Sequence, residues 1–220
     1  MKNYYSLFFL VLFIFLMPLH SIAEEMGEGP VWITAEIPSI EINHNDQKIV
    51  IERVQNNENM IDWDYALTSR PCPPFCIQPM KLAKGVETIG ELEMLDYIKQ
   101  LSDGEKVLIV DSRDVWWTEN GMIPGAVNIP WTHLHSKHAT IEEIIKILEF
   151  DFGAIYQDGL LSFEHVKTLV FYCNGNWCGQ SPTNIRSLLA LGYPADKIKW
   201  YRGGMQAWKA LGLTTVKPGK

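Results

Sequence analysis

The stretch TLVFYCNGNWCGQSP, residues 168–182, decides the fold of this 220-residue protein. It begins with an almost entirely apolar run, which predicts a buried β-strand at residues 168–173. A loop with two glycines follows, and Ser181 with Pro182 then favours a helix start, with serine as the N-cap and proline in the first turn. Gly192 ends this helix. A buried strand, a short loop and a helix in this order are typical of a parallel α/β sheet.

The same alternation continues on both sides of this stretch. Apolar runs predict two further buried strands, at residues 106–111 and 197–201, and a final helix is predicted between Gly203 and Gly212. We therefore expect an α/β domain over residues 85–220, with a central parallel sheet flanked by helices. Two further helices are predicted from capping-box pairs. Thr88 with Glu91 precedes an apolar helix face formed by Leu92, Leu95 and Ile98. Thr140 with Glu143 precedes an apolar face formed by Ile141, Ile144, Ile145 and Leu148.

An N-terminal extension, residues 24–84, precedes this domain. Residues 39–43 alternate polar and apolar side chains, residues 44–47 have the composition of a turn, and residues 48–54 alternate again, which predicts a β-hairpin. Residues 70–79, RPCPPFCIQP, cannot be helical, because proline lacks a backbone donor and restricts the residue before it. The extension is thus predicted to be β-rich and to end in a rigid connector.

The N-terminus predicts export. Residues 4–19 are apolar and uncharged, Lys2 precedes them, and small residues follow at Ser21 and Ala23. This is the pattern of a signal peptide over residues 1–23 that is cleaved after Ala23. An uncleaved membrane anchor is the alternative, although the run is shorter than the ~20 residues that span a bilayer. We expect a periplasmic or secreted protein without membrane contact after cleavage, whose cysteines meet an oxidising environment.

Composition excludes several classes of function. Nineteen Lys and Arg residues against 26 Asp and Glu residues give a net charge of −7. Such a chain repels a phosphate backbone, so we expect no nucleic-acid partner. Its 47% hydrophobic and 20% charged residues are typical of a globular protein, and only the first segment is long and apolar, which excludes a multi-span membrane protein.

Cys173 is the candidate catalytic residue, because chemistry in an open α/β sheet takes place beyond the carboxyl ends of the strands. The helix after the loop directs its free N–H groups and the positive end of its dipole at the loop. This field favours thiolate over thiol, so the pKa of Cys173 should fall. Glycines in the loop allow several amides to point inward. The candidate loop residues are Asn174, Gly175, Asn176, Trp177, Cys178, Gly179, Gln180 and Ser181.

Three motifs resemble those of the rhodanese, or sulfurtransferase, family. Residues 110–130, VDSRDVWWTENGMIPGAVNIP, resemble the family's Asp-x-Arg stretch and its following Gly-His-Ile-Pro-Gly-Ala segment. Cys173 stands where the family's active-site cysteine follows its strand. Residues 200–208, WYRGGMQAW, together with Gly212, resemble the family's closing motif. The resemblance covers residues 85–216.

The resemblance implies a small α/β fold and transfer of a sulfane sulfur. The sulfur would pass from a donor such as thiosulfate, through a persulfide on Cys173, to a thiol or another nucleophile, with the amides of residues 174–180 as its cradle. Arg113 would be an organising ion-pair residue, with Asp111 beside it in the motif. Arg202 either adds positive potential at the loop or lies at the surface. We expect a small sulfur-containing anion and a thiol or redox protein as partners, and no cofactor.

The chain departs from the family pattern at several positions. Its loop is longer and ends with Gln180, where the family often has arginine, so the donor stays open. Met122 and Trp117 replace the motif's histidine and acidic residue. The loop also holds a second cysteine, Cys178. Three roles remain open for it: a resolving thiol that forms a disulfide with Cys173, half of a structural disulfide, or a free thiol.

Two further groups of residues have alternative interpretations. For Cys72 and Cys76 we favour a local disulfide that stiffens the connector, with a second redox pair as the alternative. A zinc site built from these two cysteines and the two in the loop is less favoured, because its spacings are loose. Residues 133–138, HLHSKH, have the residue types of a metal site, but a solvated loop is favoured and no metal is expected.

Three functions remain open from the sequence. The first is an exported sulfurtransferase that uses Cys173. The second is a thiol–disulfide module that uses Cys173 and Cys178, with Cys72 and Cys76 as a relay. The third is a non-catalytic binding domain of the rhodanese fold that docks a partner through its extension. A phosphatase of the same fold is set aside, because its loop needs an arginine where position 179 is glycine.

Overall fold

The computed structural model describes residues 29–218, so the predicted signal peptide and its cleavage site after Ala23 lie outside the described residues. The chain divides into two units, Met1–Pro30 and Val31–Lys220. The extension beyond Pro30 and the α/β domain therefore share one unit. Among residues 29–218, no helix is both long enough and apolar enough to cross a membrane.

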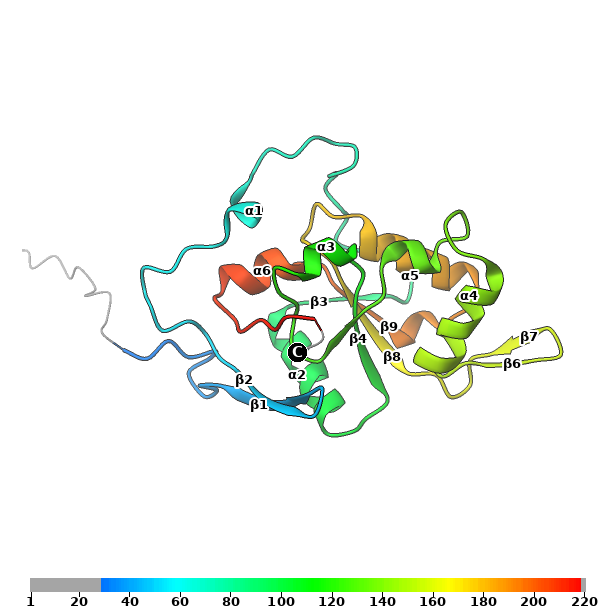
Figure 1. The fold of residues 1–220 in the computed structure, drawn as a ribbon, viewed down its shortest axis with the longest axis horizontal. Coiled ribbons are helices and arrows are strands. Elements are labelled where there is room, and N and C mark those ends of the chain that lie inside the picture. Colours follow the sequence, from blue (N-terminus) through cyan, green and yellow to red (C-terminus); the bar gives the residue numbers. More distant parts are fainter. Residues whose placement is uncertain (1–28, 219–220) are drawn as a thin grey trace, which may run out of the picture. The chain divides into compact units, whose positions relative to one another are not determined.

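A five-stranded parallel sheet forms the centre of this unit, as predicted (Figure 1). Its strand order is β3-β9-β8-β4-β5. β4 and β8 pair along their whole length, from Val107 opposite Thr168 to Asp111 opposite Tyr172. The residues after Asp111 and Tyr172 therefore emerge side by side at the carboxyl edge of the sheet. The strands are β3 (Glu87–Ile89), β4 (Val107–Asp111), β5 (Ala126–Asn128), β8 (Thr168–Tyr172) and β9 (Ile198–Tyr201).

Helices cover both faces of the sheet (Figure 1). Successive residues of a strand point to opposite faces, so Val170 joins one core cluster and Phe171 the other. The cluster around Val170 contains Ile98 of α2 and Trp208 of α6, and the cluster around Phe171 contains Leu188 of α5. The helices are α1 (Trp63–Ala66), α2 (Glu91–Ser102), α3 (Val115–Thr118), α4 (Ile141–Lys146), α5 (Gln180–Ala190) and α6 (Gly204–Ala210), and a π-helical turn (Ile147–Asp151) continues α4.

The predicted N-terminal hairpin is confirmed. β1 (Ile40–His44) and β2 (Gln47–Ile51) pair in antiparallel fashion. Asn45 and Asp46 form the turn with φ angles of +49° and +61°, a conformation that short polar side chains tolerate better than most. The side chain of Ile51 is fully buried in the core, so the hairpin packs on the α/β domain as part of it.

The predicted capping box of Thr88 and Glu91 is wrong. Thr88 lies inside β3, and its hydroxyl donates to the carbonyl of Met80. Helix α2 begins after Gly90, whose N–H donates to the carboxylate of Glu93 at 3.0 Å. β3 is three residues long and begins with two polar residues, so no apolar run distinguishes it from a helix cap.

The second capping box is confirmed. The N–H of Glu143 donates to the Thr140 hydroxyl at 3.3 Å, and the N–H of Thr140 donates to the Glu143 carboxylate at 2.8 Å. The apolar faces are shorter than predicted, because Leu92 and Ile141 in the first turns are 49% and 55% exposed. Only the later positions of each helix reach the core.

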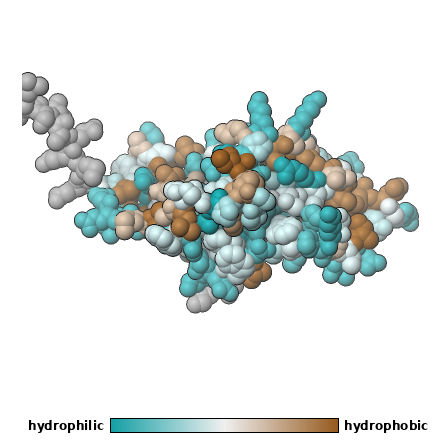
Figure 2. Space-filling model, turned by 90° about the horizontal axis from the view of Figure 1, so that it is seen from above, coloured by the Kyte–Doolittle hydropathy of each residue, from teal (hydrophilic) through white to brown (hydrophobic). Residues whose placement is uncertain are grey.

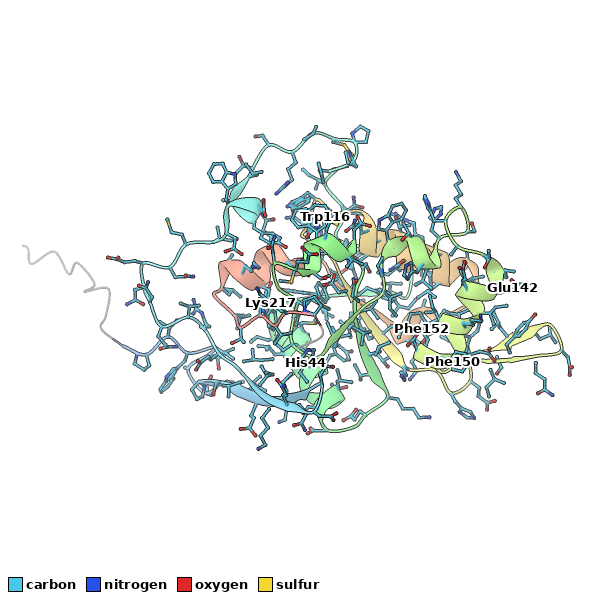
Figure 3. All side chains as sticks on the ribbon, in the orientation of Figure 1. His44, Trp116, Glu142, Phe150, Phe152 and Lys217 are labelled. Carbon is cyan, nitrogen blue, oxygen red and sulfur yellow. A yellow bond between two sulfur atoms is a disulfide. The ribbon has the colours of Figure 1, made fainter. Side chains whose placement is uncertain are left out.

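Large apolar side chains also lie at the surface. Phe150 is 81% exposed, whereas Phe152 is fully buried; both are labelled in Figure 3. The face shown in Figure 2 carries brown apolar patches interleaved with teal polar ones. Scattered exposed apolar residues are ordinary for a folded domain, so they do not by themselves define an interface. A hairpin outside the main sheet, β6 (Ile155–Gln157) with β7 (Leu160–Ser162), was not predicted.

Candidate active site

Cys173 lies directly after β8, at the carboxyl edge of the sheet. Two amides at the start of α6 fix the backbone around it. The N–H of Met205 donates to the carbonyl of Cys173, and the N–H of Gln206 donates to the carbonyl of Asn174, each at 2.9 Å. Gly204 precedes these amides with a φ of +54°, a conformation that favours glycine. The end of β8 and the start of α6 together set the position of the thiol.

The sulfur of Cys173 is surrounded by hydrogen-bond donors. The Ser181 hydroxyl donates to it at 3.1 Å, and the amides of Gly175 and Ser181 are directed at it. Burial raises the pKa of the Cys173 thiol, but hydrogen bonds from the Cys178 thiol, the Ser181 hydroxyl and these two amides outweigh burial and lower the pKa. The surroundings therefore favour the thiolate of Cys173 more than water does.

Ser181 does not cap α5, which corrects the prediction. The helix begins at Gln180 with Gly179 as its N-cap, so Ser181 already lies in the first turn. The hydroxyl of Ser181 accepts from the indole N–H of Trp200 at 3.1 Å and donates to Cys173. The Ser181 hydroxyl thus hydrogen-bonds to the buried sulfur, whereas the sequence pattern predicts that it caps the helix.

Cys178 is a free thiol next to Cys173. Neither cysteine is part of a disulfide, their exposed fractions are 2% for Cys173 and 4% for Cys178, and they form one buried cluster with Trp177. Burial raises the pKa of the Cys178 thiol, and the neighbouring Cys173 raises it further. Cys173 is therefore the more acidic member of the pair, and Cys178 holds its proton beside it.

Three side chains of the cysteine loop, residues 174–180, form hydrogen bonds with residues far away in the sequence. Sequence reasoning missed all three partners, because no motif or periodicity marks them. These bonds are the Tyr65 hydroxyl to Asn174 Oδ1 (3.3 Å), Trp177 Nε1 to Gln206 Oε1 (2.9 Å) and Gln180 Nε2 to Asp114 Oδ2 (2.7 Å).

Arg113 and Asp111 form a buried ion pair, as expected for the motif arginine. Both side chains are fully buried, and Arg113 Nη2 donates to Asp111 Oδ2 at 2.6 Å. The guanidinium also donates to the carbonyl of Gly121 at 2.8 Å and to the hydroxyl of Tyr65 at 3.1 Å. Arg113 makes no hydrogen bond to Cys173. The pair therefore organises the segments around the site and does not contact the reacting sulfur.

Part of the extension covers the cysteine loop. We call this segment, residues 70–78, the strap. The guanidinium carbon of Arg70 lies 4.1 Å from the centre of a Trp177 ring, and the ring of Phe75 meets Trp177 edge-on at 5.5 Å between centroids. Cation–π and edge-to-face contacts of this kind stabilise the packing of the strap on the loop beyond what the burial of apolar area contributes.

The end of the strap is held from two sides. The N–H of Gln78 donates to the carbonyl of Asn176 at 2.8 Å, and Arg202 Nη2 donates to the carbonyl of Gln78 at 2.8 Å. Arg202 therefore anchors the strap, a role that neither interpretation of this residue from the sequence contained.

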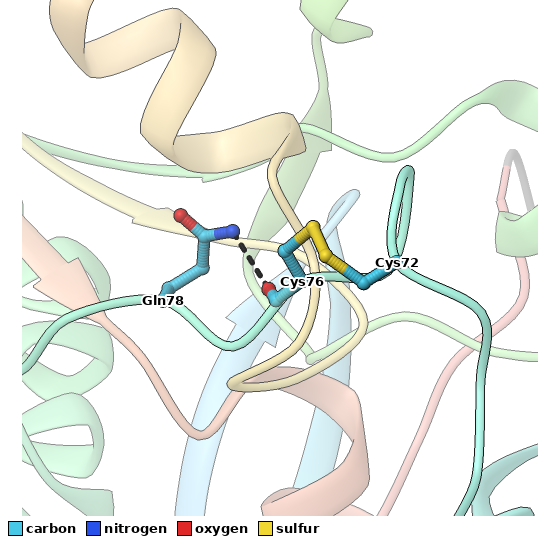
Figure 4. The surroundings of a disulfide bond; sticks show 3 residues. All are labelled: Cys72, Cys76 and Gln78. Carbon is cyan, nitrogen blue, oxygen red and sulfur yellow. Dashed lines mark hydrogen bonds between the residues drawn. A yellow bond between two sulfur atoms is a disulfide. The ribbon is translucent and has the colours of Figure 1, made fainter.

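The strap contains the predicted local disulfide, Cys72–Cys76 (Figure 4). Gln78 Nε2 donates to the carbonyl of Cys76 at 2.8 Å. The four-cysteine zinc site is excluded in this structure, because two of its ligands are bonded to each other. No group of three or more His, Cys, Asp or Glu residues within residues 29–218 could hold a metal ion, and this includes the histidines of residues 133–138.

A cavity of about 450 Å³ is bordered by the strap, the cysteine loop and α3. Phe75 and Cys178 line it, together with Trp116, which lies on α3 and is 57% exposed (Figure 3). Cys173 is not among the lining residues. A molecule in this cavity therefore contacts Cys178 but not Cys173, which is 2% exposed.

A thiol held between the end of a parallel strand and the first turn of a helix defines a cysteine-centred α/β protein. Residues 94–211, more than half of the chain, match the sequence model of the family described as the rhodanese-like domain. The chain belongs to this rhodanese-like family, as its motifs predicted. The match begins inside α2 and leaves the strap outside it.

Comparison with solved structures finds several similar chains. A Rhodopseudomonas palustris protein of unknown function, described as a possible tyrosine phosphatase, is 23% identical, with 61% of this chain and 88% of that chain covered and a TM-score of 0.41. A thiosulfate sulfurtransferase from Pseudomonas aeruginosa is 16% identical over 60% of this chain and 20% of that chain (TM-score 0.40). A human single-domain sulfurtransferase is 22% identical over 56% and 94% (TM-score 0.34). No curated protein matches the sequence.

Proposed function

We propose that this protein is an exported sulfurtransferase that carries a sulfane sulfur on Cys173. The observation that carries the proposal is the set of donors around the sulfur, with the Ser181 hydroxyl at 3.1 Å, which lowers the pKa of Cys173 despite its burial. A thiolate is the nucleophilic form of cysteine. Membership of the rhodanese-like family supports sulfur transfer as the general chemistry.

The proposed reaction has two steps. The Cys173 thiolate attacks the outer sulfur of a donor such as thiosulfate, a new S–S bond forms, and sulfite leaves with the electron pair of the broken bond. An acceptor thiolate then attacks the outer sulfur of the Cys173 persulfide and removes it, which regenerates the thiolate. The amides of Gly175 and Ser181 and the positive end of the α5 dipole stabilise the anionic sulfur in both states.

The export proposal rests on the signal-peptide pattern of residues 1–23 and has one further support. The Cys72–Cys76 disulfide suits an oxidising compartment, where disulfides persist. A small sulfur-containing anion as donor and a thiol as acceptor complete the proposal. The net charge of −7 supports a chain that does not bind nucleic acid.

Two single-cysteine variants test the assignment of the carrier. We expect Cys173→Ser to reduce transfer from thiosulfate to a thiol acceptor to the uncatalysed rate, because a hydroxyl cannot form the persulfide. Cys178→Ser keeps the Cys173 thiol and replaces the Cys178 thiol donor with a hydroxyl donor, so this variant is expected to retain the first step. Steady-state assays of both proteins check this, with thermal unfolding to confirm their folds. Transfer that survives in Cys173→Ser would contradict the assignment. If no thiol reagent modifies Cys173 in the wild type, that result would favour a non-catalytic binding domain.

The pH dependence tests the donor set around Cys173. Its lowered pKa keeps the thiolate present to lower pH than in a free cysteine, so alkylation should slow only as the pH falls through that lowered pKa. Ser181→Ala removes one donor that lowers the pKa, so the pH–rate curve should move to higher pH and its plateau should not fall. Iodoacetamide rates in the Cys178→Ser background measure this shift. An unmoved curve would show that the hydroxyl does not stabilise the thiolate.

Contact between the two thiols favours a second candidate function, thiol–disulfide exchange at Cys173 and Cys178. This reading requires the pair to oxidise reversibly to a disulfide. Incubation in a series of glutathione buffers, followed by mass analysis of alkylated protein, gives the potential of the pair. Failure of the disulfide to form at any potential would eliminate this function.

A further inference from the structure

The four cysteines differ systematically in exposure. Cys173 and Cys178 are 2% and 4% exposed, so a second protein cannot reach their sulfurs in this structure. In the strap, Cys72 is exposed and Cys76 is half-buried. The strap disulfide therefore joins one exposed cysteine to one half-buried cysteine.

The strap residue next to Cys76 packs against the cluster of buried thiols. Phe75, the residue before Cys76, packs against the cluster of Cys173, Trp177 and Cys178. Phe75 also lines the same cavity as Cys178. Gln78 links Cys76 to the cysteine loop: its side chain donates to the carbonyl of Cys76 at 2.8 Å (Figure 4), and its N–H donates to the carbonyl of Asn176 at 2.8 Å.

From this arrangement we propose that Cys72–Cys76 is a redox relay that exchanges disulfides with the Cys173/Cys178 pair. An external protein dithiol first reduces the strap disulfide at exposed Cys72. The Cys76 thiolate then attacks the Cys178 sulfur of an oxidised Cys173–Cys178 pair, forming a Cys76–Cys178 bond and releasing Cys173 as a thiolate. The Cys72 thiolate attacks Cys76, restores the strap disulfide and releases Cys178. Two electrons and two protons pass from the external dithiol to the buried pair.

The order of these steps follows from the surroundings of each sulfur. Cys178 lines the cavity that the strap borders, so it is the sulfur open to attack. The environment that stabilises the Cys173 thiolate makes Cys173 the better leaving group, since thiols of lower pKa leave faster. Exposed disulfides are the ones that exchange readily, and Cys72 provides that exposure.

Disulfide exchange between the strap and the Cys173/Cys178 pair does not depend on sulfur transfer, but the two reactions share one step. If the Cys178 thiol attacks the inner sulfur of a Cys173 persulfide, sulfide leaves and the Cys173–Cys178 disulfide forms. This entry step rests on the proposed function, and the relay would then return the pair to its reduced state. Because a chemical oxidant also forms the Cys173–Cys178 disulfide, the relay is testable without any persulfide.

Paired double variants test the proximity that the relay needs. Cys72→Ser/Cys173→Ser leaves Cys76 and Cys178, and we expect diamide to join them within one chain, as seen by peptide mapping after alkylation. The matched control, Cys76→Ser/Cys173→Ser, leaves exposed Cys72 with Cys178 and should give no such link. Thermal unfolding confirms that both proteins fold. Absence of the Cys76–Cys178 link, or equal linking in the control, would overturn the proposal.

Reduction kinetics supply a second test with an intact buried pair. Wild type and Cys72→Ser/Cys76→Ser are oxidised with diamide and then mixed with a thioredoxin-type protein or with dithiothreitol. Without the strap cysteines, reduction of Cys173–Cys178 by the protein dithiol should slow by at least about tenfold, while reduction by dithiothreitol stays similar. Equal rates with the protein dithiol would refute the relay. Loss of persulfide formation with these results intact would instead refute only the sulfurtransferase.

Discussion

Gly204→Ala is expected to abolish sulfur transfer and to destabilise the fold by about 3 kcal/mol or more. A Cβ at this position would lie 2.3 Å from the carbonyl oxygen of Cys173 and 2.9 Å from the nitrogen of Gly175. Both contacts are with backbone, and the Cys173 carbonyl is already bonded to the N–H of Met205 at 2.9 Å, so the cysteine loop cannot withdraw without losing that bond. The φ of +54° adds strain for any residue with a Cβ.

A second glycine separates the two causes of this effect. Gly104 also has a positive φ, +83°, but no atom lies within 4 Å of its Cβ position. Gly104→Ala should therefore cost only the backbone strain, roughly 1 kcal/mol, and should leave transfer intact. Thermal unfolding of both variants and thiosulfate transfer rates provide the comparison. If Gly204→Ala resembles Gly104→Ala in both measurements, the close approach of α6 to Cys173 is not what positions the thiol.

Arg113→Met is expected to reduce the free energy of unfolding by about 3–5 kcal/mol, the range found when one partner of a buried ion pair is removed. The Asp111 carboxylate would stay fully buried without its countercharge. The carbonyl of Gly121 and the hydroxyl of Tyr65 would also lose a donor. Because Tyr65 bonds to Asn174 in the cysteine loop, part of the damage should reach the active site.

The double variant Arg113→Met/Asp111→Asn removes the buried charge along with its partner. It should be more stable than Arg113→Met alone, because an unpaired buried carboxylate costs more than a neutral amide. Urea unfolding of the wild type, both single variants and the double variant measures the coupling. A loss below about 1 kcal/mol in Arg113→Met would mean that the pair does not organise this part of the fold.

The buried centre of the sheet could be predicted because its strands have a local signal. The apolar runs at residues 107–110 and 169–172 are too continuous for a half-exposed strand, and both strands are central in the sheet. β3 and β5 have three residues each and depend on neighbours for their pairing. Without an apolar run, their sequences resemble a loop or a helix cap, and the sequence pattern therefore predicts a helix cap at Thr88, which lies in β3.

The candidate site was predictable to the extent that it is local in sequence. Cys173 and the loop after it follow from a strand, two glycines and a helix start within one stretch. The strap could not be placed, because Arg70 and Phe75 contact Trp177 about a hundred residues further along the chain, through packing that leaves no periodic pattern. The role of Ser181 could not be predicted for the same reason. Local propensity predicts a helix N-cap, but the hydroxyl donates to the buried sulfur of Cys173.

The most direct test of the central claim is the mass of the protein after incubation with thiosulfate. Intact mass analysis, followed by peptide mapping without reductant, should show one added sulfur atom on Cys173 in Cys178→Ser, where no second thiol in the loop can remove it. The same treatment of Cys173→Ser should show none. An added sulfur on any other cysteine, or no added sulfur in Cys178→Ser, would contradict the account of Cys173 as the sulfur carrier.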